Sequence, residues 1–238
     1  MIKICEKCNA EVTQYYCSNC GHPIALPRID GHYLLQEIRS AFSLEKGFLL
    51  TVRELATNPG KSIKDFLNKD RNRLVKPIIF LIVTSLIYSA LANIFQFEDG
   101  YASFSDTKES TTLTIFNWVQ NNYGYANIIL TIFIGSWIKI FFRKHNTNIF
   151  EILVLLCYVM GMGMLIYSVF GIVQGLTSFN LMQIAGIIGF LYLTFAIGQF
   201  FGKGTFINYV KALFAYILGM LTFAITTLII GNMIDLIF

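Results

Sequence analysis

Charged residues are scarce in this chain. Only 13% of its 238 residues are Asp, Glu, Lys or Arg, whereas soluble domains carry roughly 25%. Hydrophobic residues make up 55% of the sequence. This composition excludes an ordinary soluble protein and predicts an all-α integral membrane protein.

Histidine is also rare, and no catalytic motif is visible. The three histidines, His22, His32 and His145, all lie outside the long apolar runs. The middles of these runs carry no ionisable residue, although coupled transporters and membrane enzymes usually need such groups at depth. Neither a metalloprotease motif nor a phosphate-binding loop occurs. We therefore expect no catalytic residues and a protein that is not an enzyme.

The first 25 residues lack the apolar stretch of a signal peptide and contain four cysteines instead. This indicates a cytoplasmic N-terminus. The spacing Cys5-x2-Cys8-x8-Cys17-x2-Cys20 is typical of a disulfide framework in secreted proteins and of a zinc site in reducing compartments. A redox pair or disordered thiols are further alternatives.

Three observations favour a zinc ribbon at residues 1–26, called the ribbon below, with Zn²⁺ as its structural cofactor. No secretion signal is seen, Asn9 and Gly21 suit the tight turn that follows each Cys pair, and so short a segment needs a metal to fold. Four thiolates complete the metal shell, so we interpret His22 as a neighbour. Residues 1–22 carry two Lys and two Glu, and we therefore expect no nucleic-acid partner.

Residues 27–76 show the periodicity of amphipathic helices. One such pattern starts at His32, another covers Phe48 to Ala56, and a third is expected to begin at Ser62 as N-cap. These helices either pack on the ribbon and the membrane helices or lie in the lipid interface. Six basic residues are candidates for contact with lipid headgroups: Lys69, Arg71, Arg73, Lys76, Arg143 and Lys144.

Residues 77–238 are expected to form a five-helix transmembrane bundle, because about 20 apolar residues cross the hydrocarbon core. The predicted spans are about 77–97, 125–142, 152–174, 181–201 and 206–234. Residues 152–201 could instead form a re-entrant hairpin. Lys and Arg dominate the predicted inner loops, and acidic residues dominate residues 98–109. The positive-inside rule then places the N-terminus inside and the C-terminus outside.

Small residues recur at a spacing that lets helices approach closely. We expect helix packing, and allow a homo-oligomer, at Gly171, Gly175, Gly198, Gly202, Ala215 and Gly219. Polar residues such as Gln174 and Gln199 lie near predicted helix ends, where they would cap or cross-link helices. The string from Met160 to Met164 offers three thioethers for copper(I), although packing is the favoured interpretation.

The N-terminal third resembles a known family. After the cysteine array, the chain reads Phe48-Leu-Leu-Thr51-x3-Leu55-x3-Pro59-Gly60 and continues through Phe66-Leu67 and Lys69-Asp-Arg71 to Pro77. Over about residues 5 to 90 this is similar to bacterial zinc-ribbon proteins of the inner membrane that are catalogued as a domain of unknown function. The resemblance implies a multi-pass protein of the bacterial inner membrane. The five-span plan is also similar to the Yip-type family, which implies a non-enzymatic role in membrane organisation.

These observations predict a non-enzymatic scaffold or adaptor whose ribbon docks a protein partner while membrane lipids surround the bundle. The alternative is a permease, channel or lipid-handling protein. A third interpretation is a regulated pore-forming effector.

Overall fold

The computed structural model describes most of the chain from residue 47 onward and part of the cysteine-rich segment. The described residues are 3–5, 7–8, 10–12, 16–21, 47–95, 97, 111, 114–115, 118–119, 123–177 and 179–237. The helix predicted from His32, the side chain of His22 and the acidic segment 98–109 lie outside them.

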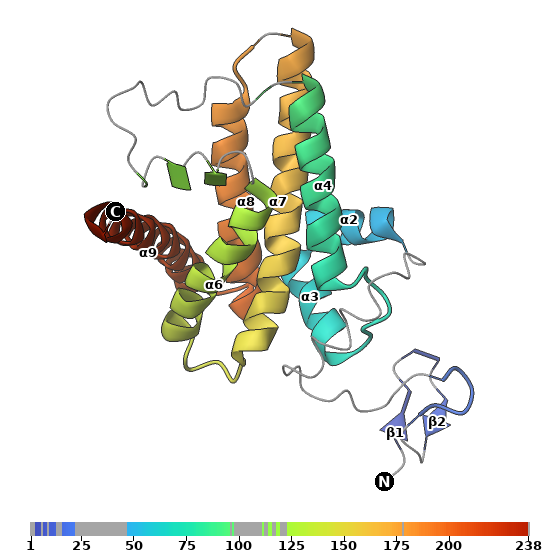
Figure 1. Ribbon diagram of the computed structural model, residues 1–238. Coiled ribbons are helices and arrows are strands. Elements are labelled where there is room, and N and C mark those ends of the chain that lie inside the picture. The colour runs from blue at the N-terminus through green and yellow to red at the C-terminus, as the bar shows by residue number, and fades with distance from the viewer. Residues whose placement is uncertain are drawn as a thin grey trace.

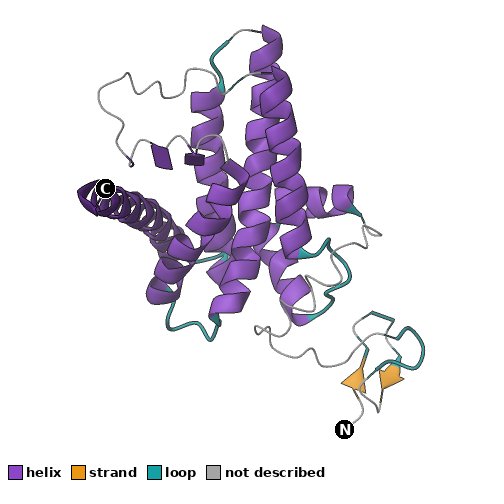
Figure 2. Cartoon of the chain, in the orientation of Figure 1, coloured by secondary structure: helices purple, strands orange, loops and turns teal. Residues whose placement is uncertain are grey.

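The described part is mostly helical, and its two paired strands lie near the N-terminus (Figure 2). The elements are β1 (Lys3–Ile4), β2 (Glu11–Val12), α2 (Phe48–Thr57), α3 (Pro59–Asn68), α4 (Pro77–Phe95), α6 (Tyr123–Phe141), α7 (Ile149–Thr177), α8 (Met182–Gly202) and α9 (Phe206–Ile237). Apart from the two short strands, the described residues form helices and turns, which confirms the predicted all-α class.

Within the described residues, four helices are long and apolar enough to cross a membrane: α4, α7, α8 and α9. The prediction of five spans is therefore wrong. The predicted span 125–142 corresponds to α6, whose described apolar part, Ala126–Phe141, is shorter than the about 20 residues that cross the hydrocarbon core. Lys139 lies in the last turn of α6, where its ammonium group donates to the carbonyl of Thr147 at 2.6 Å.

The segment 152–201 is covered by two long helices, α7 and α8, and each is by itself long and apolar enough to cross a membrane. The helix α7 extends three residues beyond the predicted span 152–174 at each end, from Ile149 to Thr177. Its first turn is capped. Asn148 and Glu151 cap this end reciprocally: the backbone N–H of each donates to the side chain of the other at 2.8 Å.

The helix α3 begins at Pro59, three residues before the predicted N-cap Ser62. Proline suits the first position of a helix because its missing N–H would have no partner there and its φ is already helical. The Asn58-Pro59-Gly60 string therefore ends α2 and starts α3 at once. Ser62 lies inside α3, where its hydroxyl donates to the carbonyl of Glu54 at 3.5 Å.

The long helices α4, α7 and α8 run side by side, and α6 packs against α7 and α9 (Figure 1). The start of α4, the end of α6, the start of α7, the end of α8 and the start of α9 all lie at one end of this bundle. We call this the basic end, because the segments there carry Lys and Arg. The pair α2–α3 packs against α7 and α8 at the same end.

The core is apolar, and the buried polar residues within the described part are uncharged. They are Thr51, Thr84, Asn127, Thr131, Ser168, Gln199, Asn208 and Thr227. Several of them satisfy their hydroxyl within their own helix: Thr84 donates to the carbonyl of Phe80 at 2.9 Å, and Ser168 to that of Met164 at 2.8 Å. The interior is thus packed without ion pairs among the described residues.

Candidate functional site

The four cysteines of the N-terminal array lie on two facing turns. Strands β1 and β2 pair antiparallel, with Ile4 opposite Glu11, and this pairing brings the turn after β1 next to the turn at 17–20. The N–H of Gly21 donates to the carbonyl of Cys17 at 2.8 Å, with Gly21 at φ 68°. Gly21 thus lies in the tight turn expected after the second Cys pair, while Asn9 lies outside the described residues.

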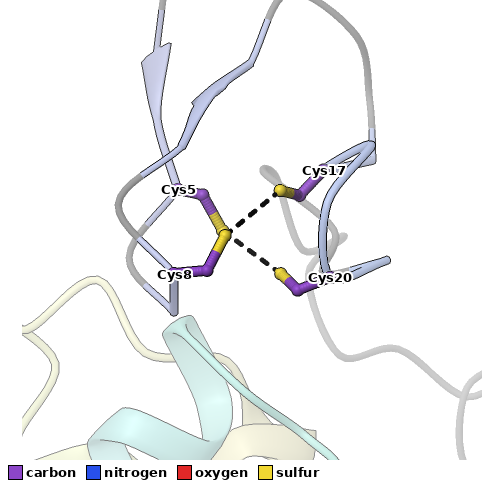
Figure 3. Close-up of side chains that lie close together, drawn as sticks. All are labelled: Cys5, Cys8, Cys17 and Cys20. Carbon is purple, nitrogen blue, oxygen red and sulfur yellow. Dashed lines mark hydrogen bonds between the residues drawn. The ribbon is translucent and has the colours of Figure 1, made fainter.

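The four sulfur atoms point toward one another (Figure 3). The Sγ atoms of Cys5 and Cys20 are 3.6 Å apart, and those of Cys8 and Cys17 are 3.5 Å apart. All four lie within 4.8 Å of one another. Four thiolates around a tetrahedral metal with bonds of about 2.3 Å would be about 3.8 Å apart. The arrangement therefore fits a metal ion better than a pair of disulfides.

Backbone N–H groups stabilise the thiolate form of two of these cysteines. The N–H of Lys7 lowers the pKa of Cys5, and the N–H of Ala10, followed by the Cys17 thiol, lowers the pKa of Cys8 to about 6. Because metals bind the thiolate, such groups favour metal binding at neutral pH. A set of four sulfur ligands suits zinc and other thiophilic metals.

The cysteines also account for the small core of this segment. Cys5 and Cys17 are almost fully buried together with Val12, and few other apolar contacts hold the two turns. Nζ of Lys7 lies 3.9 Å from a carboxylate oxygen of Asp70 beside the end of α3; Lys7 is exposed and Asp70 is half-buried. An ion pair of this kind contributes little stability. The cysteine-rich segment is thus joined only lightly to the bundle by the contacts of the described residues.

The motif that carries the family resemblance places α2 and α3 against the bundle. Thr51 and Leu55 are fully buried. The hydroxyl of Thr51 accepts a hydrogen bond from the N–H of Val75 at 3.0 Å, and the hydroxyl of Tyr158 donates to the carbonyl of Val75 at 2.7 Å. The backbone N–H and carbonyl of Val75, just before α4, are therefore bound by side chains of α2 and α7.

The other half of the motif contacts α8. The N–H of Gly60 donates to Oε1 of Gln199 at 2.7 Å in a buried contact, and the hydroxyl of Tyr192 donates to the carbonyl of Leu55 at 3.0 Å. Phe66 packs edge-on against Tyr158, with ring centroids 5.4 Å apart. The sequence left open whether these helices pack on the ribbon and the membrane helices or lie in the lipid interface. In the structure, α2 and α3 pack on the long apolar helices.

The predicted headgroup residues lie at the basic end, where some have protein partners. Lys69 pairs with Asp65 at 3.6 Å, and Arg73 pairs with Glu54. A guanidinium nitrogen of Arg71 donates to the carbonyl of Leu67 at 3.4 Å. Arg143 and Lys144 are exposed in the segment between α6 and α7, and Lys76 is half-buried before α4.

The predicted packing residues lie at close approaches between elements. A Cβ built on Gly171 would lie 2.4 Å from Phe97, and one on Gly175 would lie 2.8 Å from Phe95. A Cβ on Gly219 would lie 2.7 Å from the Cα atom of Ile134 in α6.

The remaining members of this set lie along α8 and α9. Gly198 is placed against the ring of Tyr209, Gly202 ends α8 beside Asn208, and Ala215 is fully buried.

The side chain of Gln174 in α7 caps the start of α8, as expected from the sequence for a polar residue near a helix end. Its Oε1 accepts from the N–H groups of Leu181 and Met182 at the start of α8, at 2.8 and 3.1 Å. Its Nε2 donates to the carbonyl of Phe97 at 3.3 Å. The methionines of the 160–164 string are buried within α7. Met162 is two residues from each of the others, on another face of the helix, so the three thioethers do not converge.

The cap of α7 and the contacts of Tyr158 and Tyr192 were not predicted from the sequence. Asn148-x2-Glu151 matches the spacing of a capping box and could have been found from the sequence. Tyr158 and Tyr192 lie in apolar runs, where the need of a buried tyrosine hydroxyl for a hydrogen-bond partner could have indicated such contacts.

Together these features define a multi-helix membrane protein that carries a four-cysteine cluster able to hold a metal. Residues 45–89 match the model of a family described as "Protein of unknown function (DUF3667)". This confirms the resemblance to a family catalogued as a domain of unknown function. The matched residues contain α2, α3 and most of α4, the elements joined by the contacts of Thr51, Leu55 and Gly60. No curated protein matches the chain, and no solved structure does so either.

Proposed function

We propose that the chain is a non-enzymatic scaffold or adaptor of the bacterial inner membrane, in which a structural zinc ribbon docks a partner protein. The observation that carries this proposal is the convergence of four thiols in a small unit beside a packed apolar bundle. A closed set of four protein ligands leaves no open position for a substrate. Its role is then to fold a surface that another protein can bind.

The basic end is proposed to face the cytoplasm. Every described Lys or Arg after Gly47 belongs to α2, α3 or the helix ends and connections at this end: Arg53, Lys61, Lys64, Lys69, Arg71, Arg73, Lys76, Lys139, Arg143, Lys144, Lys203 and Lys211. Cytoplasmic connections are enriched in Lys and Arg. This orientation would place the ribbon, which precedes α2, in the cytoplasm, where thiols stay reduced and available to zinc.

The permease or lipid-handling alternative has less support. Coupled transport usually needs ionisable groups at membrane depth, and the buried polar residues of the described part are all uncharged. They also satisfy their hydrogen bonds largely within the bundle, as Ser168 does.

The adaptor proposal is tested by purifying the full chain from native membranes in mild detergent and quantifying co-purified proteins by mass spectrometry. Cys17→Ser removes a metal ligand. Cys157→Ser is the matched control, because Cys157 lies in α7 away from the cluster. We expect a stoichiometric partner that falls at least tenfold with Cys17→Ser and stays unchanged with Cys157→Ser. Identical co-purified proteins in all three samples would overturn the adaptor role.

A further inference from the structure

Three basic side chains from separate elements gather around one aromatic cluster at the basic end. Lys64 belongs to α3, His145 to the segment between α6 and α7, and Lys211 to the second turn of α9. They are 81 and 66 residues apart in the sequence, so only the fold brings them together.

The aromatic cluster consists of Phe142, Phe200 and Phe201. The rings of Phe142 and Phe201 stack with centroids 3.8 Å apart, and Phe200 meets Phe201 edge-on at 5.0 Å. All three rings are buried. They form a fixed apolar floor at the meeting point of α6, α8 and α9.

The basic groups contact this floor. The Nζ atom of Lys64 lies 5.6 Å from the centroid of the Phe200 ring, and Nζ of Lys211 lies 5.8 Å from that of Phe142. The ring of His145 meets Phe201 at 5.2 Å. Cation–π contacts hold the two ammonium groups over the floor and reduce the entropy lost when a ligand binds them.

The positive charge here is not neutralised within the described residues. No carboxylate of that part forms an ion pair with Lys64 or Lys211, and the nearby Asp65 pairs with Lys69. Burial, followed by the charges of Lys64 and Lys211, lowers the pKa of His145. The imidazole is therefore neutral near pH 7 and offers an N–H donor beside two ammonium groups.

We propose that Lys64, His145 and Lys211 bind a phosphate group, the chemistry shared by an anionic phospholipid headgroup and a free phosphate. Two ammonium groups and one imidazole N–H match the charge and the several acceptor oxygens of a phosphate. At the end of a membrane bundle, the aromatic floor also suits the start of an acyl chain. This site is distinct from the ribbon and does not depend on the proposed adaptor role.

The test uses the full-length protein in a non-ionic detergent after exchange of native lipid. Native mass spectrometry with added phosphatidylglycerol, and in parallel with zwitterionic phosphatidylcholine, measures lipid binding. Calorimetric titration with inorganic phosphate at constant ionic strength measures free phosphate. Preferential binding of phosphatidylglycerol supports the site with a lipid headgroup as its occupant, and saturable binding of inorganic phosphate supports it with a free phosphate.

The double variant Lys64→Gln/Lys211→Gln is expected to weaken the binding at least tenfold. Lys61→Gln/Lys203→Gln removes the same charge from exposed positions on α3 and after α8, and it is expected to change affinity less than twofold. Lys64→Arg/Lys211→Arg keeps both charges and is expected to restore binding, which separates lost binding from lost folding. Equal weakening by the two glutamine pairs, or no binding of either ligand to the wild type, would overturn the proposal.

Discussion

At Gly60, the packing of α3 on α8 leaves room for a hydrogen atom only. A Cβ there would lie 2.5 Å from the backbone nitrogen of Phe200 and 2.6 Å from the carbonyl carbon of Gln199. Backbone atoms inside a helix cannot move aside as a flexible side chain can. We therefore expect Gly60→Ala to lower the free energy of unfolding by about 1–3 kcal/mol, measured as a lower Tm in detergent.

Gly163→Ala is the matched control for this substitution. Gly163 also lies inside a helix, but a Cβ added there would meet no atom within 4 Å. Alanine there should stabilise the helix by about 0.5–1 kcal/mol. If Gly60→Ala melts at or above the wild-type Tm, the close contact between α3 and α8 is wrong.

Individual residues differed in how far the sequence could predict them. The cysteine cluster was predictable, because Cys5, Cys8, Cys17 and Cys20 are close in the chain and their spacing reports local geometry. The bond from Gly60 to Gln199 was not, since 139 residues separate the partners. The motif around Gly60 could be read as a family signature, but its packing role needed the fold.

The docking of α3 onto α8 depends on the buried amide of Gln199. Replacing it by Leu leaves the N–H of Gly60 buried without its partner, which costs about 1–3 kcal/mol. We predict that Gln199→Leu increases hydrogen–deuterium exchange in α3 at least tenfold relative to wild type. The exchange of the middle of α7 should not change.

Gln183→Leu provides the comparison for this element. Gln183 is also on α8 but is exposed near its other end, so α3 should keep its wild-type exchange. Faster exchange of α3 in both variants, or in neither, would show that Gln199 does not hold this helix.

The elements also show where periodicity is sufficient and where it is not. The apolar spacing in residues 48–56 correctly predicted α2, because its buried residues Thr51 and Leu55 lie one turn apart on one face of the helix. The start of α3 was misplaced because Pro59 was read only as a helix breaker. The segment 125–142 was counted as a span because it is apolar, but the described apolar part of α6, Ala126–Phe141, is shorter than the about 20 residues that cross the hydrocarbon core.

For the whole molecule, the distribution of charge predicts that the basic end faces the cytoplasm. An epitope inserted after Gly204, between α8 and α9, should be reached by antibody only from the cytoplasmic side. An epitope after Phe179, in the connection between α7 and α8, should be reached only from outside. Access to both epitopes from one side would contradict α8 as a membrane span.

The overall architecture was predictable in class but not in detail. Low charge and long apolar runs sufficed for an all-α membrane protein. The predicted number of spans was wrong because α6 was counted as a fifth span. The packing of α2–α3 on the bundle also stayed open, because an amphipathic stripe fits lipid and protein equally well. Leu55 and Gly60 contact α8 through Tyr192 and Gln199, which lie more than a hundred residues away in the sequence.

We infer that the ribbon folds only with bound metal, whereas the membrane bundle folds without it. The decisive measurement is hydrogen–deuterium exchange of the whole chain in detergent, with zinc bound and after its removal by a chelator. We expect residues 3–21 to lose their protection when zinc is removed, while α3, α7 and α8 keep theirs. Unchanged protection in residues 3–21 would rule out a metal-folded ribbon, and a loss that spreads through α7 and α8 would rule out an independent bundle.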